Sequence, residues 1–387
     1  MLTYCVTDSN GRVLLEHNPE QALLPASNIK LFTCAMALES FDADAPPSQK
    51  LRVLSTPRQL TIEFKGNLFF SCRYQGRDIL SRRIDQLADA IKAHGQTEFE
   101  SLYITCPTDY LNPLAHYPCV SFVSFNENTL DLEISHGEAL STPLEQREFS
   151  LVPDKSLKEQ VRKGSRISYN PTQNSLDYWR LEGDNWTPDI LLCELRKRGI
   201  SIKKLSKIAD HEAQQLASFQ DPVLTSQLLH SSLCHSDNFR AEMLGLHLRY
   251  SQQKTDLQQC LQTLSDKIGL TQTFMADGSG LSRDNHTSTR DICRLLNYMS
   301  QHRQSPTWMN SLAISGISGT LQNAISYPIA KGKFIGKTGT LRDARALSGY
   351  YTNKNGRVFT VSVLQNNEDC STFSSMLKQI LSDIDEK

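Results

Sequence analysis

The stretch Pro25-Ala26-Ser27-Asn28-Ile29-Lys30 leads into an apolar run from Leu31 to Leu38, which predicts a helix of about three turns. Pro25 stands just before this helix, where its missing amide hydrogen costs nothing. Ser27 and Lys30 are three residues apart, so they share one helix face. A lysine kept uncharged by burial or by a nearby cation can take the proton of a serine hydroxyl. The pair is therefore a candidate nucleophile and base.

The Ser-x-x-Lys spacing does not carry this interpretation alone. The same spacing recurs at Ser201, Ser251 and Ser375. Ser27 could also be an ordinary helix N-cap, whose hydroxyl accepts a bond from the first turn. The meaning of the motif therefore depends on the motifs found later in the chain.

Length and composition exclude several classes of protein. A chain of 387 residues suits two domains, and 39% hydrophobic with 21% charged residues is typical of a globular protein. Because 41 basic residues nearly balance 42 acidic ones, no overall charge attracts the chain to nucleic acid or to a membrane surface. No apolar run approaches the ~20 residues of a spanning helix. We expect neither nucleic acid as a partner nor a transmembrane segment.

The N-terminal residues Met1 to Thr7 alternate like a strand. They lack the basic region and long apolar core of a secretory signal. As written, the sequence predicts a cytoplasmic chain, or one that has lost its native start.

Cysteine and histidine spacing gives no metal-binding motif. The ten cysteines contain no Cys-x-x-Cys, and the ten histidines contain no His-Glu-x-x-His. Several cysteines, such as Cys34 and Cys193, lie in apolar settings, where buried thiols act as small hydrophobic side chains. We therefore predict no metal and no cofactor.

Hydrophobic patterns divide the chain into three segments. Residues 2–7 and 12–17 predict a hairpin, the Ser27 helix comes next, and the helical pattern stops at 42–47. Residues 48–204 form a strand-rich segment that predicts an inserted domain. Its expected strands are 60–64, 68–72, 102–105 and 129–134, and its expected helices are 83–94 and 188–198.

Residues 205–387 are first helical and then predict three strands, around 337–340, 346–351 and 358–364, and a last helix at 372–383. Strands at both ends of the chain can form one antiparallel sheet flanked by helices, which is an α+β fold. We therefore predict one domain from 1–47 and 205–387, and a second from 48–204.

Two further motifs come after Ser27-x-x-Lys30 in the chain. Ser236-Asp237-Asn238 opens a helical pattern, and Lys337-Thr338-Gly339 lies on a predicted strand. Each alone could be structural, the first as a helix cap and the second as a strand end. Ser-x-Asn also occurs at Ser124 and Ser168, but neither opens a helical pattern. Together and in this order, the three motifs predict a catalytic site.

Each motif residue suits one chemical task. Ser236 can pass a proton to a leaving amine, and Asn238 can hold a substrate amide and steady Lys30. Lys337 can keep Lys30 neutral and attract a substrate carboxylate, which Thr338 can also bind.

The backbone of the same motifs has roles too. Gly339 leaves room for a substrate chain along the strand edge. The amides of Ser27 and Thr340 would form an oxyanion hole.

The sequence resembles the class C low-molecular-mass penicillin-binding proteins, the D-alanyl-D-alanine carboxypeptidase/endopeptidase family. The similar segments are Leu24–Leu31, Ser236–Leu244, Ala276–Arg283, Ser318–Leu321 and Gly336–Leu341. In that family, as here, a large insertion separates the first two motifs.

The resemblance implies a penicillin-binding-protein/β-lactamase-like transpeptidase fold and a periplasmic location. It also implies an acyl-enzyme on Ser27, with D-Ala-D-Ala stem peptides of peptidoglycan and β-lactams as ligands. Arg283 is then a candidate contact to a substrate carboxylate, or else a structural salt bridge in its loop. The alternatives are a β-lactamase or esterase with the same three motifs, and a catalytically inactive peptidoglycan-binding relative.

Overall fold

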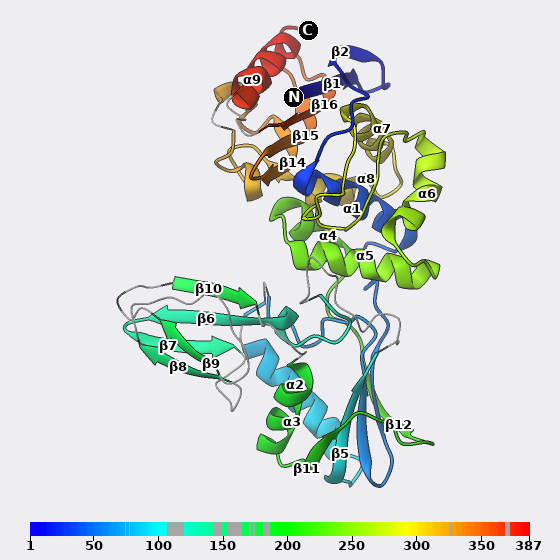
Figure 1. Ribbon diagram of the computed structural model, residues 1–387, viewed down its shortest axis with the longest axis vertical. Helices are drawn as coiled ribbons and strands as arrows, with labels where there is room; N and C mark the ends of the chain where they lie inside the picture. The colour runs from blue at the N-terminus through cyan, green and yellow to red at the C-terminus, as the bar shows by residue number, and fades with distance from the viewer. Residues whose placement is uncertain are drawn as a thin grey trace. The chain divides into compact units, whose positions relative to one another are not determined.

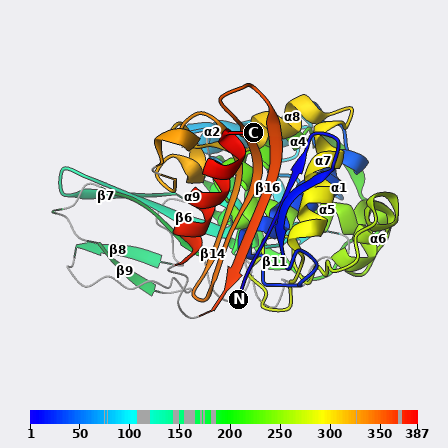
Figure 2. The same ribbon diagram turned by 90° about the horizontal axis from the view of Figure 1, so that it is seen from above.

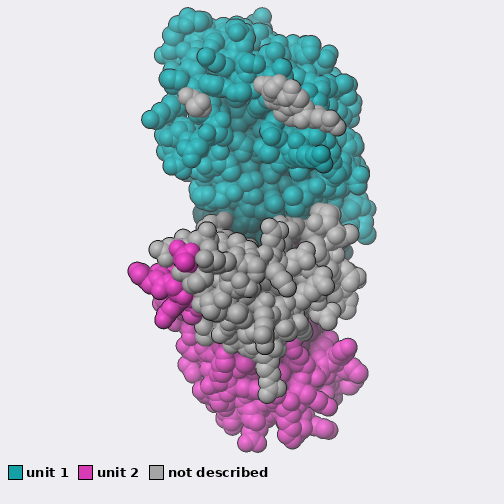
Figure 3. Space-filling model, turned by 60° about the vertical axis from the view of Figure 1, so that its left-hand side comes forward, with its two compact units in different colours: residues 1–47, 224–387 teal, residues 48–223 magenta. Residues whose placement is uncertain are grey.

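The computed structural model describes residues 1–387 except 74, 77, 107–119, 143–148, 154–164, 170–171, 173–174, 181–185, 326 and 368–371. Within 149–153, 165–169 and 175–180 it describes the backbone alone. The chain divides into two compact units, residues 1–47 with 224–387 and residues 48–223, which Figure 3 colours separately. Each unit is considered by itself below.

Unit 1 is built on a six-stranded antiparallel sheet in the order β13-β14-β15-β16-β1-β2 (Figure 1). The N-terminal hairpin thus extends the sheet made by the C-terminal strands, as the sequence predicted. The strands are β1 (Leu2–Asp8), β2 (Val13–His17), β13 (Ala313–Ile314), β14 (Phe334–Leu341), β15 (Ala344–Thr352) and β16 (Val358–Asn366).

Helices cover both faces of this sheet (Figure 2). They are α1 (Ile29–Ser40), α4 (Thr225–Cys234), α5 (Asn238–Gln252), α6 (Leu257–Ile268), α7 (Thr289–Ser300), α8 (Ser305–Ser311) and α9 (Thr372–Asp385). Short 3-10 turns are η1 (Ala26–Asn28), η4 (Gly319–Leu321) and η5 (Pro328–Ala330).

Alternation along β16 explains this layering. Phe359, Val361 and Val363 pack with α9 in one core cluster. On the opposite face, the Thr360 hydroxyl donates to Asn297 on α7 at 2.6 Å. Since successive side chains of a strand point to opposite faces, one strand binds a helix layer on each side.

Helix α1 lies inside the helical layer of unit 1. Its residues from Ile29 to Leu38 are all buried, and it packs against α4, α5, α6 and α7. A helix that is apolar all round is one enclosed by other helices. The apolar run after Lys30 thus fixes the position of the lysine itself.

Unit 2 contains a five-stranded mixed sheet in the order β11-β5-β4-β3-β12 and two smaller sheets, β10-β6-β7 and β8-β9. Its strands are β3 (Leu51–Ser55), β4 (Gln59–Glu63), β5 (Glu98–Thr105), β6 (Thr129–Ser135), β7 (Glu138–Thr142), β8 (Phe149–Pro153), β9 (Ser165–Tyr169), β10 (Ser175–Arg180), β11 (Ser201–Ser206) and β12 (Gln214–Phe219). The helices are α2 (Asp78–Lys92), α3 (Thr187–Lys197) and the 3-10 turn η3 (Asn126–Asn128).

The predicted strand at 68–72 is wrong. The segment is buried but forms turns. Its backbone groups bond to side chains: the Arg83 guanidinium donates to the carbonyls of Phe69 and Ser71 at 2.7 Å, and Leu68 N donates to Asp221 at 3.0 Å. Because buried backbone groups must be paired, these side chains replace a strand partner.

The predicted domain boundary after residue 204 is also wrong, because the second unit continues to residue 223. Strand β11 spans the predicted boundary and pairs with β5 in parallel, and β12 pairs with β3. Residues 205–223 thus complete the sheet of unit 2, and the sequence pattern did not reveal β12.

Eight of the ten cysteines lie in the described part of the chain, all as free thiols, and seven of them are buried. This confirms the interpretation as small hydrophobic side chains for the seven buried thiols, Cys34 among them, whereas Cys193 is only partly buried. Cys119 and Cys370 fall outside the described residues. Within the same described part, none of the helices combines the length and apolar character needed to cross a membrane.

Candidate active site

Ser27 lies in the 3-10 turn η1, directly before α1 begins at Ile29. Ala26, the preceding residue, has φ +48°, a strained value for a residue with a side chain. Gly280 packs against this turn with φ +87°, and a Cβ there would lie 2.0 Å from the Ala26 carbonyl oxygen. The turn is therefore held by a neighbour that must be glycine, and Ser27 itself stays partly exposed.

The Lys30 ammonium is fully buried and has three partners. Its Nζ lies 3.0 Å from Ser27 Oγ, 2.7 Å from Asn238 Oδ1 and 2.6 Å from the Ser279 carbonyl oxygen. The last two are acceptors only and orient the amine, so that the nitrogen lies within proton-transfer distance of the hydroxyl.

Ser236 and Asn238 flank the start of α5. Asp237 is the N-cap, and its carboxylate accepts from Arg240 N at 3.1 Å. Ser236 has φ +61°, another strained backbone position. Its hydroxyl lies 2.9 Å from Nζ of the buried Lys337, which also donates to the Thr338 carbonyl at 2.8 Å.

Strand β14 carries the third motif directly beside the Ser27 turn. The Asn28 amide donates to the Lys337 carbonyl at 3.2 Å. A Cβ on Gly339 would lie 2.7 Å from the Pro25 carbonyl oxygen and 2.9 Å from Ala346 Cβ. Gly339 therefore allows the strand and the turn to approach each other, a role that the sequence interpretation missed.

A carboxylate network supports the loop that orients Lys30. Glu242, buried on α5, accepts from Gly278 N at 3.1 Å and Ser279 N at 2.8 Å. Asp277 accepts from Gly280 N at 2.7 Å. These bonds hold the Ser279 carbonyl against the Lys30 amine.

Arg283 forms a bidentate ion pair with Asp343 in the turn between β14 and β15, at 2.6 and 2.5 Å. The carboxylate that binds Arg283 in the structure is therefore the protein's own Asp343, as the salt-bridge interpretation expected.

Thr338 shares a hydrogen bond of 2.8 Å with Thr320 on η4. A pocket along β14 is lined in part by Thr338, Gly339 and Thr340.

The structure thus brings Ser27, Lys30, Asn238, Ser236 and Lys337 together from three distant stretches of chain. The amides of Ser27 and Thr340 remain a predicted oxyanion hole. Sequence reasoning did not single out Glu242 or the Ser279 carbonyl for a role. A backbone carbonyl leaves no signal in sequence, although both residues lie within segments that carry the family resemblance.

Burial is the main reason why Lys30 can be uncharged. Burial lowers the pKa of Lys30 from 10.5 to about 8. The negative charges of Glu242, Asp277 and Asp237 act in the opposite direction and raise this pKa. The sequence interpretation allowed either burial or a nearby cation as the cause, and named Lys337 as that cation. The pKa of Lys337 is itself lowered well below its ordinary value, first by burial and then by the charge of Lys30.

We expect acylation of Ser27 to accelerate as pH rises to about 8 and then to level off, because only neutral Lys30 accepts a proton. The same shift is a cost to folding at lower pH, because burial disfavours the charged lysine. Between about 8 and 10.5 the unfolded chain binds more protons at this lysine, so the free energy of unfolding increases with pH in that window. Stopped-flow measurements of the acylation rate as a function of pH check the predicted rise and levelling of the rate.

Glu242→Gln should move the midpoint of this pH profile below 8, because the Glu242 charge raises the pKa of Lys30. The matched control is Glu39→Gln, which neutralises a carboxylate near the other end of α1 and should leave the midpoint unchanged. A midpoint that moves equally in both variants would contradict the assignment.

Gly339→Ala should destabilise unit 1 by about 1–3 kcal/mol, as overpacking of a tight contact does. Gly245→Ala on α5 is the control, because its Cβ meets only flexible Leu257 side-chain atoms, the nearest at 3.2 Å. Urea unfolding of both variants measures the difference. Equal stability of the two would show that β14 does not need the close approach.

Known proteins with similar sequences are D-alanyl-D-alanine carboxypeptidases. Residues 2–104 and 162–384 match the model of the D-Ala-D-Ala carboxypeptidase 3 (S13) family. The chain is 30% identical over 185 residues to the D-alanyl-D-alanine carboxypeptidase DacB of Haemophilus influenzae. The aligned region covers 45% of this chain and 38% of that protein. It is 25% identical over 422 residues to a D-alanyl-D-alanine carboxypeptidase of Actinomadura sp., covering 93% of this chain and 76% of the relative.

Solved structures show the same fold. Penicillin-binding protein 4 (dacB) from Haemophilus influenzae matches with a TM-score of 0.75 at 16% identity, covering 100% of this chain and 96% of that one. The same protein complexed with a β-lactam matches with a TM-score of 0.70 at 17% identity, over 95% and 90% of the two chains. The predicted penicillin-binding-protein-like α+β fold is therefore confirmed.

Proposed function

Because this chain belongs to the D-Ala-D-Ala carboxypeptidase 3 (S13) family of serine-type hydrolases, we propose that it cleaves the D-Ala-D-Ala bond of peptidoglycan stem peptides through an acyl-enzyme on Ser27. The observation that carries the proposal is the distance of 3.0 Å between Ser27 Oγ and the buried, pKa-lowered amine of Lys30. By this mechanism the chain acts as a carboxypeptidase and, on cross-linked stem peptides, as an endopeptidase. Because peptidoglycan lies outside the cytoplasm, we expect the chain to act there.

Acylation begins when neutral Lys30 takes the Ser27 proton. The Ser27 oxygen then forms a bond to the penultimate D-alanine carbonyl carbon, and the negative charge develops on the carbonyl oxygen. The amides of Ser27 and Thr340 are suited to receive this charge, and one such donor is typically worth about 2.7–4 kcal/mol.

Breakdown of the intermediate needs a proton on the leaving nitrogen. Lys30, now protonated, returns the proton either directly or through the Ser236 hydroxyl, and the C–N bond breaks to release D-alanine. Water then attacks the ester carbon and gives a proton to Lys30. The bond between that carbon and the Ser27 oxygen breaks, Lys30 returns the proton to this oxygen, and the shortened stem peptide leaves with a new terminal carboxyl group. Lys337 and Thr338 are suited to bind the terminal carboxylate of the substrate, since their amine and hydroxyl can each donate a hydrogen bond to it.

β-Lactams fit the same site as acylating ligands, because ring opening leaves the amine tethered and the ester in place. Incubation with a fluorescent penicillin should give one stable label per chain. Incubation with diacetyl-Lys-D-Ala-D-Ala should release D-alanine, and the D-Ala-L-Ala peptide should serve as an unreactive control. Rapid turnover of penicillin would instead indicate a β-lactamase, and absence of any label an inactive binding relative.

A further inference from the structure

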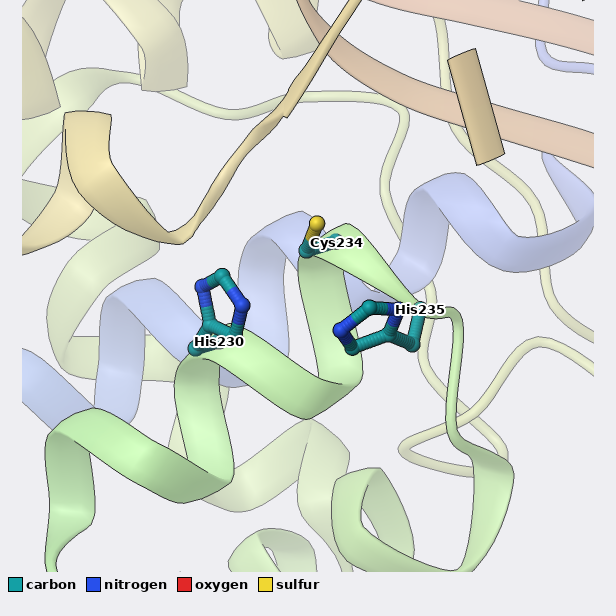
Figure 4. Close-up of side chains that lie close together, drawn as sticks. All are labelled: His230, Cys234 and His235. Atoms are coloured by element: carbon teal, nitrogen blue, oxygen red, sulfur yellow. The ribbon is translucent and has the colours of Figure 1, made fainter. Parts of the chain in front are cut away.

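A second group of reactive side chains lies at the end of α4. His230 and Cys234 are four residues apart on this helix and so share one face, and His235 is its C-cap. One possible ligand atom from each residue lies within 4.8 Å of the other two. Figure 4 shows the two imidazole rings on either side of the Cys234 sulfur.

We propose that His230, Cys234 and His235 bind a divalent transition-metal ion of the zinc class, with a fourth position open to water. A thiolate and two imidazoles are the ligands that Zn²⁺ prefers, whereas Mg²⁺ and Ca²⁺ prefer oxygen. Three protein ligands plus water is the composition of an open zinc site. The sequence predicted no metal because these residues have the spacing His-x-x-x-Cys-His, which is neither Cys-x-x-Cys nor His-Glu-x-x-His.

The geometry needs only a small adjustment to close around an ion. Metal–ligand distances of about 2.0–2.3 Å place tetrahedral ligand atoms roughly 3.3–3.7 Å apart. The side chains must therefore contract from separations of up to 4.8 Å. Cys234 is buried, whereas the two histidines are exposed, so small changes in their side-chain torsions can bring the rings closer to it.

A second contact prepares His230 for this role. Its Nδ1 lies 3.2 Å from the Asn310 carbonyl oxygen, which can only accept a hydrogen bond. The proton of a neutral ring is then on Nδ1, and Nε2 carries the lone pair that a metal needs. A backbone carbonyl behind the ligating ring is the usual support of a metal-bound histidine.

The site would be held at the edge of the active site, because Ser236 comes directly after His235 in the chain. Binding would displace the Cys234 thiol proton to solvent, as metal binding to thiols does. The inference does not rest on the proposed peptidase activity, because its readouts are metal binding and stability.

Titration of the chelator-treated full chain with Zn²⁺ and Co²⁺ tests the proposal. We expect one ion per chain, a higher melting temperature with Zn²⁺, and with Co²⁺ the near-ultraviolet charge-transfer absorption of a cobalt–thiolate bond. Cys234→Ser should abolish that absorption, and His230→Gln should weaken binding by at least about tenfold.

The matched controls are Cys193→Ser and His211→Gln, which remove a partly exposed thiol and an exposed imidazole of unit 2. Both should bind as the wild type does. If Cys234→Ser does not fold, the loss of metal affinity in His230→Gln, a change at an exposed residue, still tests the proposal. Equal binding by all variants, or cobalt binding without thiolate absorption, would overturn the proposal.

Discussion

Ser27→Ala should abolish both penicillin labelling and D-alanine release, with a loss of about 10⁴-fold or more in rate, as nucleophile removal does in other serine hydrolases. The physical reason is that Ser27 supplies the hydroxyl at 3.0 Å from the Lys30 amine, whereas the other two described partners of that amine are carbonyl oxygens. Gel fluorescence and a D-alanine assay measure the two losses.

Ser375→Ala is the matched control. Ser375 stands three residues before Lys378 on α9, so the spacing repeats that of Ser27 and Lys30, but both side chains are exposed. The variant should label and hydrolyse as the wild type does. Labelling that survives in Ser27→Ala would remove Ser27 from the mechanism.

Lys30→Met should slow acylation by about 10²–10⁴-fold, the range that general bases contribute. Methionine fills much of the same buried volume without an amine, so the nucleophile stays in place and loses its proton acceptor. Rates measured from about pH 6 to 10 should no longer rise, in contrast to the wild type, whose profile reflects the lowered pKa of Lys30. Circular dichroism and thermal unfolding confirm that the variant is folded.

The control for this variant is Lys378→Met, which removes an exposed amine with the same serine spacing and should leave acylation unchanged. An acylation rate in Lys30→Met that still rises through about pH 8 would mean that another group accepts the Ser27 proton. Lys337 would then be the next candidate, because it is the other buried amine of the site.

The three motifs could be recognised in sequence because each depends on local spacing. Ser27 and Lys30 share one turn, Ser236 and Asn238 flank one helix start, and Lys337 lies on one strand. The alternating strands at both ends of the chain also predicted the main sheet. The family resemblance was needed to predict that the three motifs meet in one site, because local spacing does not show which distant segments come together.

The remaining features are tertiary and leave weak local signals. Burial of Lys30, which lowers its pKa, results from helices that enclose α1 on several sides. The contact of Gly339 with Pro25 joins residues more than three hundred positions apart. In unit 2, the apolar segment 68–72 resembled a strand because it is buried, but its backbone bonds to Arg83.

The most direct test of the account is to locate the covalent adduct by mass spectrometry after reaction of the wild-type chain with penicillin. We predict a mass increase of one intact penicillin, confined to the peptide that carries Ser27. An adduct on another residue, or release of D-alanine from the stem peptide without any adduct at Ser27, would contradict it.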